Sequence, residues 1–126
     1  MRITTKSEYA LISLLDIIKN SNGNAVSLRD IAKRQKISID YLEQLFKTLK
    51  DKDIVQSFRG PRGGYMVKDP QKITILQIVT SVNDEPTYEM KSESSSQEAL
   101  KVASLFSMID HTFLEELKNV TLSQLS

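Results

Sequence analysis

The 126-residue sequence contains no cysteine and no tryptophan. Without thiols the chain can form no disulfide, no thiol nucleophile and no zinc or iron–sulfur site of the usual cysteine-ligated kind. It also lacks a long apolar run: charged residues interrupt its first twenty positions, so it has neither a signal-peptide core nor the ~18 apolar residues of a membrane span. We therefore expect a cytoplasmic protein with no membrane partner.

Histidine is nearly absent as well, since His111 is the only one. A metal site at His111 would need further ligands, and only Asp110 and Glu115 are near it in the sequence. The same carboxylates have no neighbouring nucleophile or phosphate-binding loop, which acid/base chemistry would require. We interpret this region as a solvated helix face and expect neither a metal site nor an enzyme.

The small net charge of +1 hides a difference between the two parts of the chain. Residues 1–70 carry 13 Lys or Arg and 8 Asp or Glu, a net +5, whereas residues 71–126 carry 4 and 8, a net −4. A basic front part and an acidic rear part indicate that only the front part meets a polyanion.

Apolar residues recur at helical spacing in five segments, which predicts helices over 5–20, 27–35, 39–51, 75–83 and 97–119, with a last turn over 122–125. The third has the clearest buried stripe, made of Ile39, Leu42, Leu45, Phe46 and Leu49. Two short helices joined by a tight connection, the second amphipathic and partly basic, are typical of a helix-turn-helix.

A β-hairpin is predicted directly after the third helix. Residues 54–59 and 65–67 read as two strands, and three of the four glycines lie in the turn at 60–64 between them. We expect a mainly α fold with a small β-hairpin: a winged helix-turn-helix DNA-binding domain over 1–83, a linker or loop over 84–96, and a long dimerisation helix with a C-terminal turn over 97–126.

The exposed face of the third helix carries groups that can read DNA. They are Ser38, Asp40, Tyr41, Glu43, Gln44 and Lys47. A carboxylate such as Glu43 accepts from the cytosine amino group and Gln44 pairs with adenine, while a lysine binds phosphate. Arg59 or Arg62 on the hairpin would enter a minor groove. The third helix could also present an ordinary solvated face, and the wing could be an ordinary surface hairpin. Taken together, however, the helix and the wing favour DNA binding.

The long helix has one sustained apolar stripe. It consists of Val102, Phe106, Ile109, Phe113 and Leu117. A helix of this length exceeds what a small domain needs for its own core, so its free part must be covered by something else, and a second copy of the chain is the simplest partner. We therefore expect a homodimer.

Three motifs carry a resemblance to a known family. Residues 1–10 (MRITTKSEYA), 37–46 (ISIDYLEQLF) and 59–65 (RGPRGGY) resemble the Rrf2 family of bacterial transcription regulators, and within it the iron–sulfur cluster regulators of the IscR type. The resemblance implies a winged-helix homodimer with a long C-terminal dimerisation helix. It also implies that Ser38, Tyr41, Glu43 and Gln44 touch base edges or phosphate, with Arg59 in the minor groove.

The chain departs from the family at the cofactor site. Cluster-binding members carry three cysteines and a histidine between the fourth helix and the dimerisation helix, whereas here the last cysteine position falls on Leu100 and the histidine position on Ala103. We expect no cofactor, and in particular no family-type iron–sulfur cluster.

The sequence thus predicts a dimeric DNA-binding repressor that reads a pseudo-palindromic operator. Its control would come from protein concentration, a small effector or a regulatory protein that meets the loop at 84–96. The alternative from another class is a winged-helix adaptor that binds proteins and no DNA. The cations Arg59 and Arg62 at the tip of the wing favour DNA, because an adaptor would not need them there.

Overall fold

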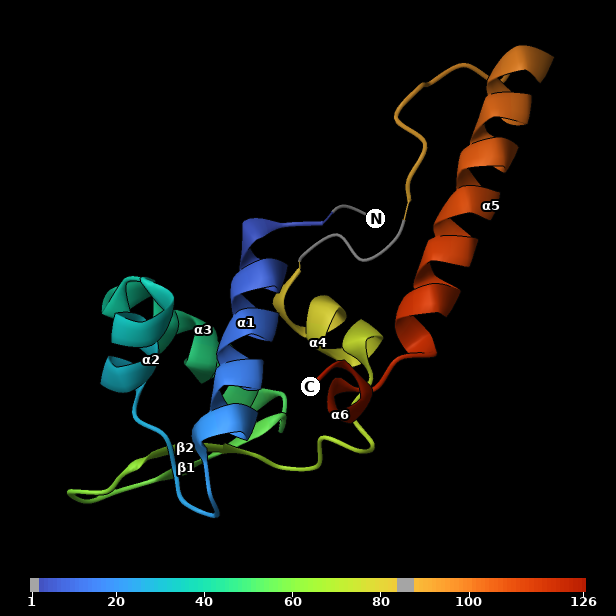
Figure 1. Ribbon diagram of the computed structural model, residues 1–126. Coiled ribbons are helices and arrows are strands. Elements are labelled where there is room, and N and C mark those ends of the chain that lie inside the picture. Colours follow the sequence, from blue (N-terminus) through green and yellow to red (C-terminus); the bar gives the residue numbers. More distant parts are fainter. Residues whose placement is uncertain (1–2, 84–87) are drawn as a thin grey trace.

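The computed structural model describes residues 3–83 and 88–126, and within them the chain forms six helices and one antiparallel hairpin (Figure 1). In chain order they are α1 (Thr5–Asn20), α2 (Leu28–Gln35), α3 (Ile39–Asp51), β1 (Val55–Phe58), β2 (Gly64–Val67), α4 (Ile75–Val82), α5 (Gln97–Lys118) and α6 (Leu122–Leu125). This is the predicted mainly α fold with a β-hairpin, and the boundaries agree with the sequence pattern to within one or two residues.

A hydroxyl side chain begins each helix. The oxygen of the residue before the helix accepts a hydrogen bond from the backbone N–H three positions on, which satisfies one of the free donors of the first turn. The capping residues are Thr4, Ser27, Ser38, Thr74, Ser96 and Thr121. The helix starts are therefore set locally by single Ser or Thr residues in the sequence.

The core lies between α1, α2, α3 and α4. Leu14, Ile31, Phe46 and Ile78 come from these four helices and are fully buried. The predicted stripe of α3 is confirmed at four of its five positions. Ile39 is the exception at 39% exposed, because it lies at the first position of the helix and at one edge of the stripe, beyond Phe46.

The wing is stiffened by a third segment. β1 pairs with β2 in the register Val55 with Val67, and on the outer side of β2 Tyr65 exchanges two backbone hydrogen bonds with Val26, at 2.9 and 3.0 Å. A side chain at Gly64 would place its Cβ 2.2 Å from the Val26 carbonyl oxygen. Glycine is therefore required for the wing to lie this close to the segment before α2.

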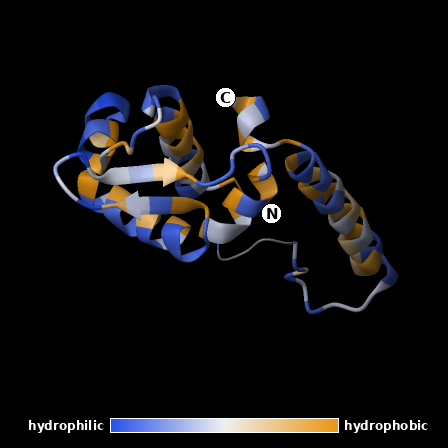
Figure 2. Ribbon diagram, turned by 90° about the horizontal axis from the view of Figure 1, so that it is seen from below, coloured by the Kyte–Doolittle hydropathy of each residue, from blue (hydrophilic) through white to orange (hydrophobic). Residues whose placement is uncertain are grey.

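Helix α5 projects away from the winged-helix unit (Figures 1 and 2), and no residue of it is buried. The segment after α5 turns back onto the unit. Ile75 donates to the carbonyl of Val120 at 2.8 Å, Leu122 donates to the carbonyl of Ile73 at 2.9 Å, and the Leu122 side chain is fully buried in the core.

The predicted loop at 84–96 lies in part outside the described residues, and its described portion, 88–96, forms no helix or strand. None of the helices in the described ranges combines the length and the hydropathy needed to cross a bilayer.

Candidate nucleic-acid interface

One face of α3 gathers most of the predicted DNA-reading side chains. Asp40, Glu43, Gln44 and Lys47 are all exposed there, within two turns of the helix. Ser38 precedes them as the N-cap, with its Oγ accepting from the Tyr41 amide at 3.3 Å. The hydroxyl of Ser38 is thus engaged with the helix end, while the four longer side chains are free to meet a groove.

Tyr41 differs from the other predicted site residues because it is only half-exposed. Its ring meets that of Tyr9 on α1 edge to face, with centroids 5.3 Å apart and planes at 82°. Burial, with a smaller contribution from Tyr9, raises the pKa of Tyr41 above its ordinary value, so the phenol stays neutral at physiological pH. Tyr41 therefore braces the start of α3 against α1, and any DNA contact it makes is as a neutral hydroxyl.

An ion pair joins α2 to α1. The Asp16 carboxylate is fully buried and accepts from Arg34 and Gln35, which lie at the end of α2. Burial raises the pKa of Asp16, but these hydrogen bonds outweigh it and hold the pKa below its ordinary value of 3.8. The first helix of the helix-turn-helix is therefore fixed against α1.

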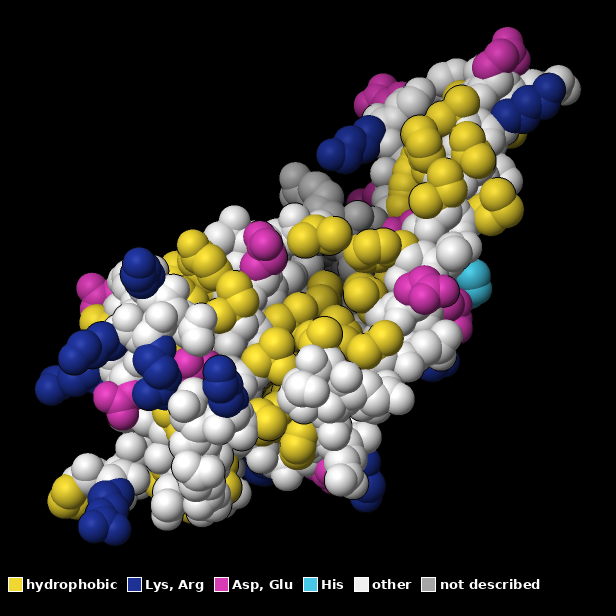
Figure 3. Space-filling model, in the orientation of Figure 1, with side chains coloured by type: hydrophobic (Ala, Val, Ile, Leu, Met, Phe, Trp, Pro, Cys, Tyr) yellow, Lys and Arg dark blue, Asp and Glu magenta, His cyan; other side chains and the backbone are white. Residues whose placement is uncertain are grey.

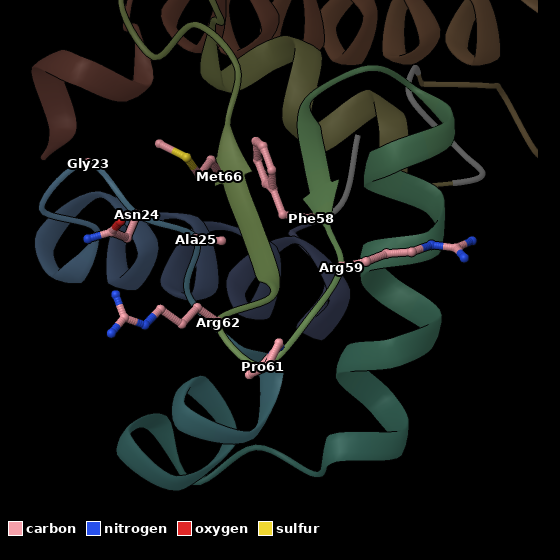
Figure 4. Close-up of a pocket in the computed structure, with 8 residues that line it drawn as sticks. All are labelled: Gly23, Asn24, Ala25, Phe58, Arg59, Pro61, Arg62 and Met66. Carbon is pink, nitrogen blue, oxygen red and sulfur yellow. The ribbon is translucent and has the colours of Figure 1, made fainter.

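The two arginines of the wing extend in opposite directions (Figure 4). The guanidinium of Arg59 reaches across toward α3, whereas that of Arg62 points to the other side, where Asn24 lies. Both arginines and Asn24 contribute to the lining of a hollow of about 500 Å³ between the wing and the turn before α2. The two guanidinium groups therefore lie on different sides of the wing.

Three cations on the neighbouring helix were not among the predicted site residues. Arg29, Lys33 and Lys36 are exposed on α2 and at its end, close to the connection that leads into α3. Lys and Arg side chains gather over this end of the molecule in Figure 3. Their position in the sequence could have indicated phosphate contacts, because the first helix of a helix-turn-helix crosses the phosphate backbone.

The predicted dimerisation stripe divides into two parts along α5. Val102, Phe106 and Ile109 are 49%, 47% and 53% exposed. Apolar side chains gather on the surface of α5 in Figure 3. Phe113 and Leu117 are half-buried within their own chain, and Leu117 packs against the core. The exposed part of the stripe is thus its N-terminal portion.

The residues present do not fit an iron–sulfur cluster. Such clusters are held by thiolates, and the chain has no cysteine. Within the described ranges, no three His, Asp or Glu side chains come together as a metal site would require.

Comparisons with known proteins find transcriptional regulators that are similar to this chain in sequence. The model of the Rrf2 family, described as iron-dependent transcriptional regulators, matches residues 3–126. An HTH-type transcriptional regulator of Haemophilus influenzae is 46% identical over 85 residues, which are 67% of this chain and 57% of that protein. The Escherichia coli HTH-type transcriptional regulator IscR is 44% identical over 85 residues, 67% of this chain and 52% of that protein. The matched part therefore spans little more than half the length of these curated relatives.

Solved structures match over nearly the whole chain. CymR, the global cysteine regulator of B. subtilis, superposes with a TM-score of 0.86 at 28% identity, covering 99% of this chain and 95% of that chain. IscR of T. potens gives a TM-score of 0.80 at 28% identity, covering 99% and 85%. The winged helix followed by a long projecting helix is thus an arrangement already seen in regulators.

Proposed function

The chain belongs to the Rrf2 family of transcriptional regulators, and we propose that it is a dimeric DNA-binding repressor that reads a pseudo-palindromic operator. Its named relatives are transcriptional regulators, not enzymes. In this proposal the two α3 helices of a dimer enter successive major grooves, and the wings enter the adjacent minor grooves.

One observation carries the proposal: α3 presents an exposed face of base-reading side chains, and the wing that follows it carries two exposed arginines. The exposed carboxylate and amide of Glu43 and Gln44 have the chemistry to read base edges, and Arg59 extends toward the same helix (Figure 4). A guanidinium in a narrow minor groove meets concentrated negative potential. The brace between Tyr9 and Tyr41 supports the role by fixing the start of α3.

The exposed apolar part of α5 supports the dimer. Val102, Phe106 and Ile109 would be covered by the same helix of a second chain, since a two-fold axis places identical patches against each other. Two winged helices in such a dimer present two reading surfaces, which matches a pseudo-palindromic operator.

The proposal includes no family-type iron–sulfur cluster. Serine hydroxyls do not replace thiolates, because oxygen is a harder ligand than sulfur. Control would then come from protein concentration, a small effector or a regulatory protein at the loop over 84–96. Deleting residues 88–96 should remove such a response in cells; a response that survives intact would place the control elsewhere.

Binding-site selection from random duplexes tests the function. We expect an enriched inverted-repeat sequence and a mobility shift that weakens steeply as salt rises from 0.05 to 0.3 M, because phosphate contacts release counterions. A winged-helix adaptor would enrich no sequence. That outcome, from protein verified as folded, would contradict DNA recognition and favour the adaptor.

A further inference from the structure

The side of the wing that faces away from α3 carries its own pair of donors. Arg62 is exposed, and Asn24 lies on the same side of the hairpin (Figure 4). Both line the hollow between the wing and the turn before α2, to which Arg59 also contributes. The exposed face of α3 that carries Glu43 and Gln44 includes neither of them.

The two donors belong to one rigid unit. The turn that carries Asn24 is closed by a hydrogen bond from the Asn24 amide to the Ser21 carbonyl at 2.7 Å and by one from the Ser21 hydroxyl to the Asn24 carbonyl at 2.6 Å. Two residues later, Val26 is paired with Tyr65 of β2. Asn24 is therefore held at a fixed distance from the strand that leads out of the Arg62 turn.

The lining of the hollow suits a sugar–phosphate unit. None of the described residues that line it is acidic, and Arg62 and Asn24 supply N–H donors. The rest of the lining includes Phe58, 42% exposed, with Pro61 and Met66, which offer apolar surface for a deoxyribose ring. A guanidinium with a neighbouring amide is a suitable donor set for a phosphate.

We propose that Arg62 and Asn24 bind one backbone phosphate of DNA, on the strand that borders the minor groove on the side away from α3. This inference rests on the proposed DNA binding. A hairpin seated in the minor groove has one strand on each side of it, so Arg59, directed at α3, and Arg62, directed away, meet different strands. Arg62 then adds affinity without reading sequence, while Arg59 responds to groove width.

A scan with single neutral methylphosphonates along the selected operator tests this. We expect wild-type protein to lose affinity about tenfold at one phosphate in each half-site, as for a charged hydrogen bond. Arg62→Ala should bind the unmodified duplex more weakly and lose much less than wild type at that phosphate, because only the neutral Asn24 contact remains there. The slope of log affinity against log salt concentration should become shallower by about 0.9 for each phosphate contact that is lost. A dimer on two half-sites loses two such contacts.

Matched variants separate phosphate binding from groove reading. Arg62→Lys should keep the sensitive phosphate, because a point charge still binds phosphate, and Asn24→Asp should weaken binding there by repulsion. Arg59→Ala should keep the sensitive phosphate but lose the preference for A·T over G·C pairs in the groove. Arg62→Gln provides a second neutral variant, with thermal unfolding as the check that the fold is intact.

The outcomes distinguish this inference from the proposed function. A wild type that enriches no duplex would contradict both. A wild type that binds its operator, with Arg62→Ala and Arg62→Gln as sensitive as wild type at every phosphate, would overturn only the Arg62 site. Loss of A·T preference in Arg62→Ala would overturn it as well, by placing Arg62 in the groove. Competition by inorganic phosphate, without any sensitive phosphate in the duplex, would reveal a free-anion site instead.

Discussion

Arg34 binds the buried carboxylate of Asp16 through two hydrogen bonds, from Nε to Oδ2 at 3.0 Å and from Nη2 to Oδ1 at 2.7 Å. The two partners differ in exposure: the Asp16 side chain is fully buried, whereas that of Arg34 is 38% exposed. Removing the arginine would leave a buried charge, whereas removing the acid would leave a cation that water can reach. The pair is therefore energetically asymmetric.

Arg34→Leu should destabilise the fold by about 2 kcal/mol at pH 7, less than the ~3–5 kcal/mol for a fully buried pair. The pKa of Asp16 lies below its ordinary value in the folded chain, so its contribution is present above that ordinary value and is lost as pH falls through the folded pKa. The difference between variant and wild type should therefore shrink in acid. Urea unfolding at several pH values measures it.

Lys33→Leu is the control for this prediction, since Lys33 is an exposed cation of the same helix. It should change the free energy of unfolding by no more than about 0.5 kcal/mol. A destabilisation by Arg34→Leu that stays constant from neutral to acidic pH would show that lost packing, not the ion pair, is the cause.

Glu43 should discriminate between sequences, whereas Lys47 should add affinity to all of them. Glu43→Ala should relax the preferred motif with little loss of overall affinity, because the change also removes a charge that repels phosphate. Lys47→Ala should weaken every duplex alike and lower the salt slope by about 1 per contact. Selection experiments on the two variants measure this, and an unchanged motif for Glu43→Ala would rule out its reading role.

Ile109→Asp should convert the dimer to a folded monomer. Ile109 is 53% exposed on a single chain, so the charge disturbs the proposed interface and not the core. Leu100→Asp is the matched control: Leu100 is 54% exposed but lies nine positions earlier on α5, on the opposite side of the helix. Sedimentation equilibrium should show a monomer for the first variant and a dimer for the second. A wild-type monomer would contradict the interface.

Anaerobically purified protein should contain no stoichiometric iron and show no visible cluster absorbance, because the chain has no thiolate. Its affinity for the operator should be the same with and without a chelator or oxygen. One cluster's iron per protomer, together with a visible absorbance, would overturn this expectation and require ligands other than cysteine.

The elements of the fold could be predicted from the sequence because their signals are local. A capping hydroxyl such as Ser38 fixes a helix start, and the stripe of Leu42, Leu45 and Leu49 fixes the face that is buried. The glycine-rich turn between β1 and β2 likewise predicts the hairpin. These signals each involve residues within about two helical turns of one another.

The features that could not be predicted depend on residues far apart in the sequence. No residue near Val26 in the sequence indicates that Val26 pairs with Tyr65. Likewise, the residues around Leu122 do not indicate that its side chain fills the core beside α4. The opposite directions of Arg59 and Arg62 follow from the backbone of the wing, which the order of residues does not reveal. Phe113 and Leu117 continue the periodicity of Phe106, yet both are half-buried within a single chain, and Leu117 packs against the core.

The segment after α5 packs onto the winged-helix unit, so the C-terminal end of α5 forms a fixed base for the helix. Backbone hydrogen bonds between Ile75 and Val120 and between Leu122 and Ile73 hold this base next to the first turn of α4. The 22 residues of α5 extend about 33 Å from this base. A tilt of about 5° there moves the far end by about 3 Å, nearly one base-pair step of DNA. An angular change too small to disturb the core would thus be magnified into a change in spacing between two joined chains.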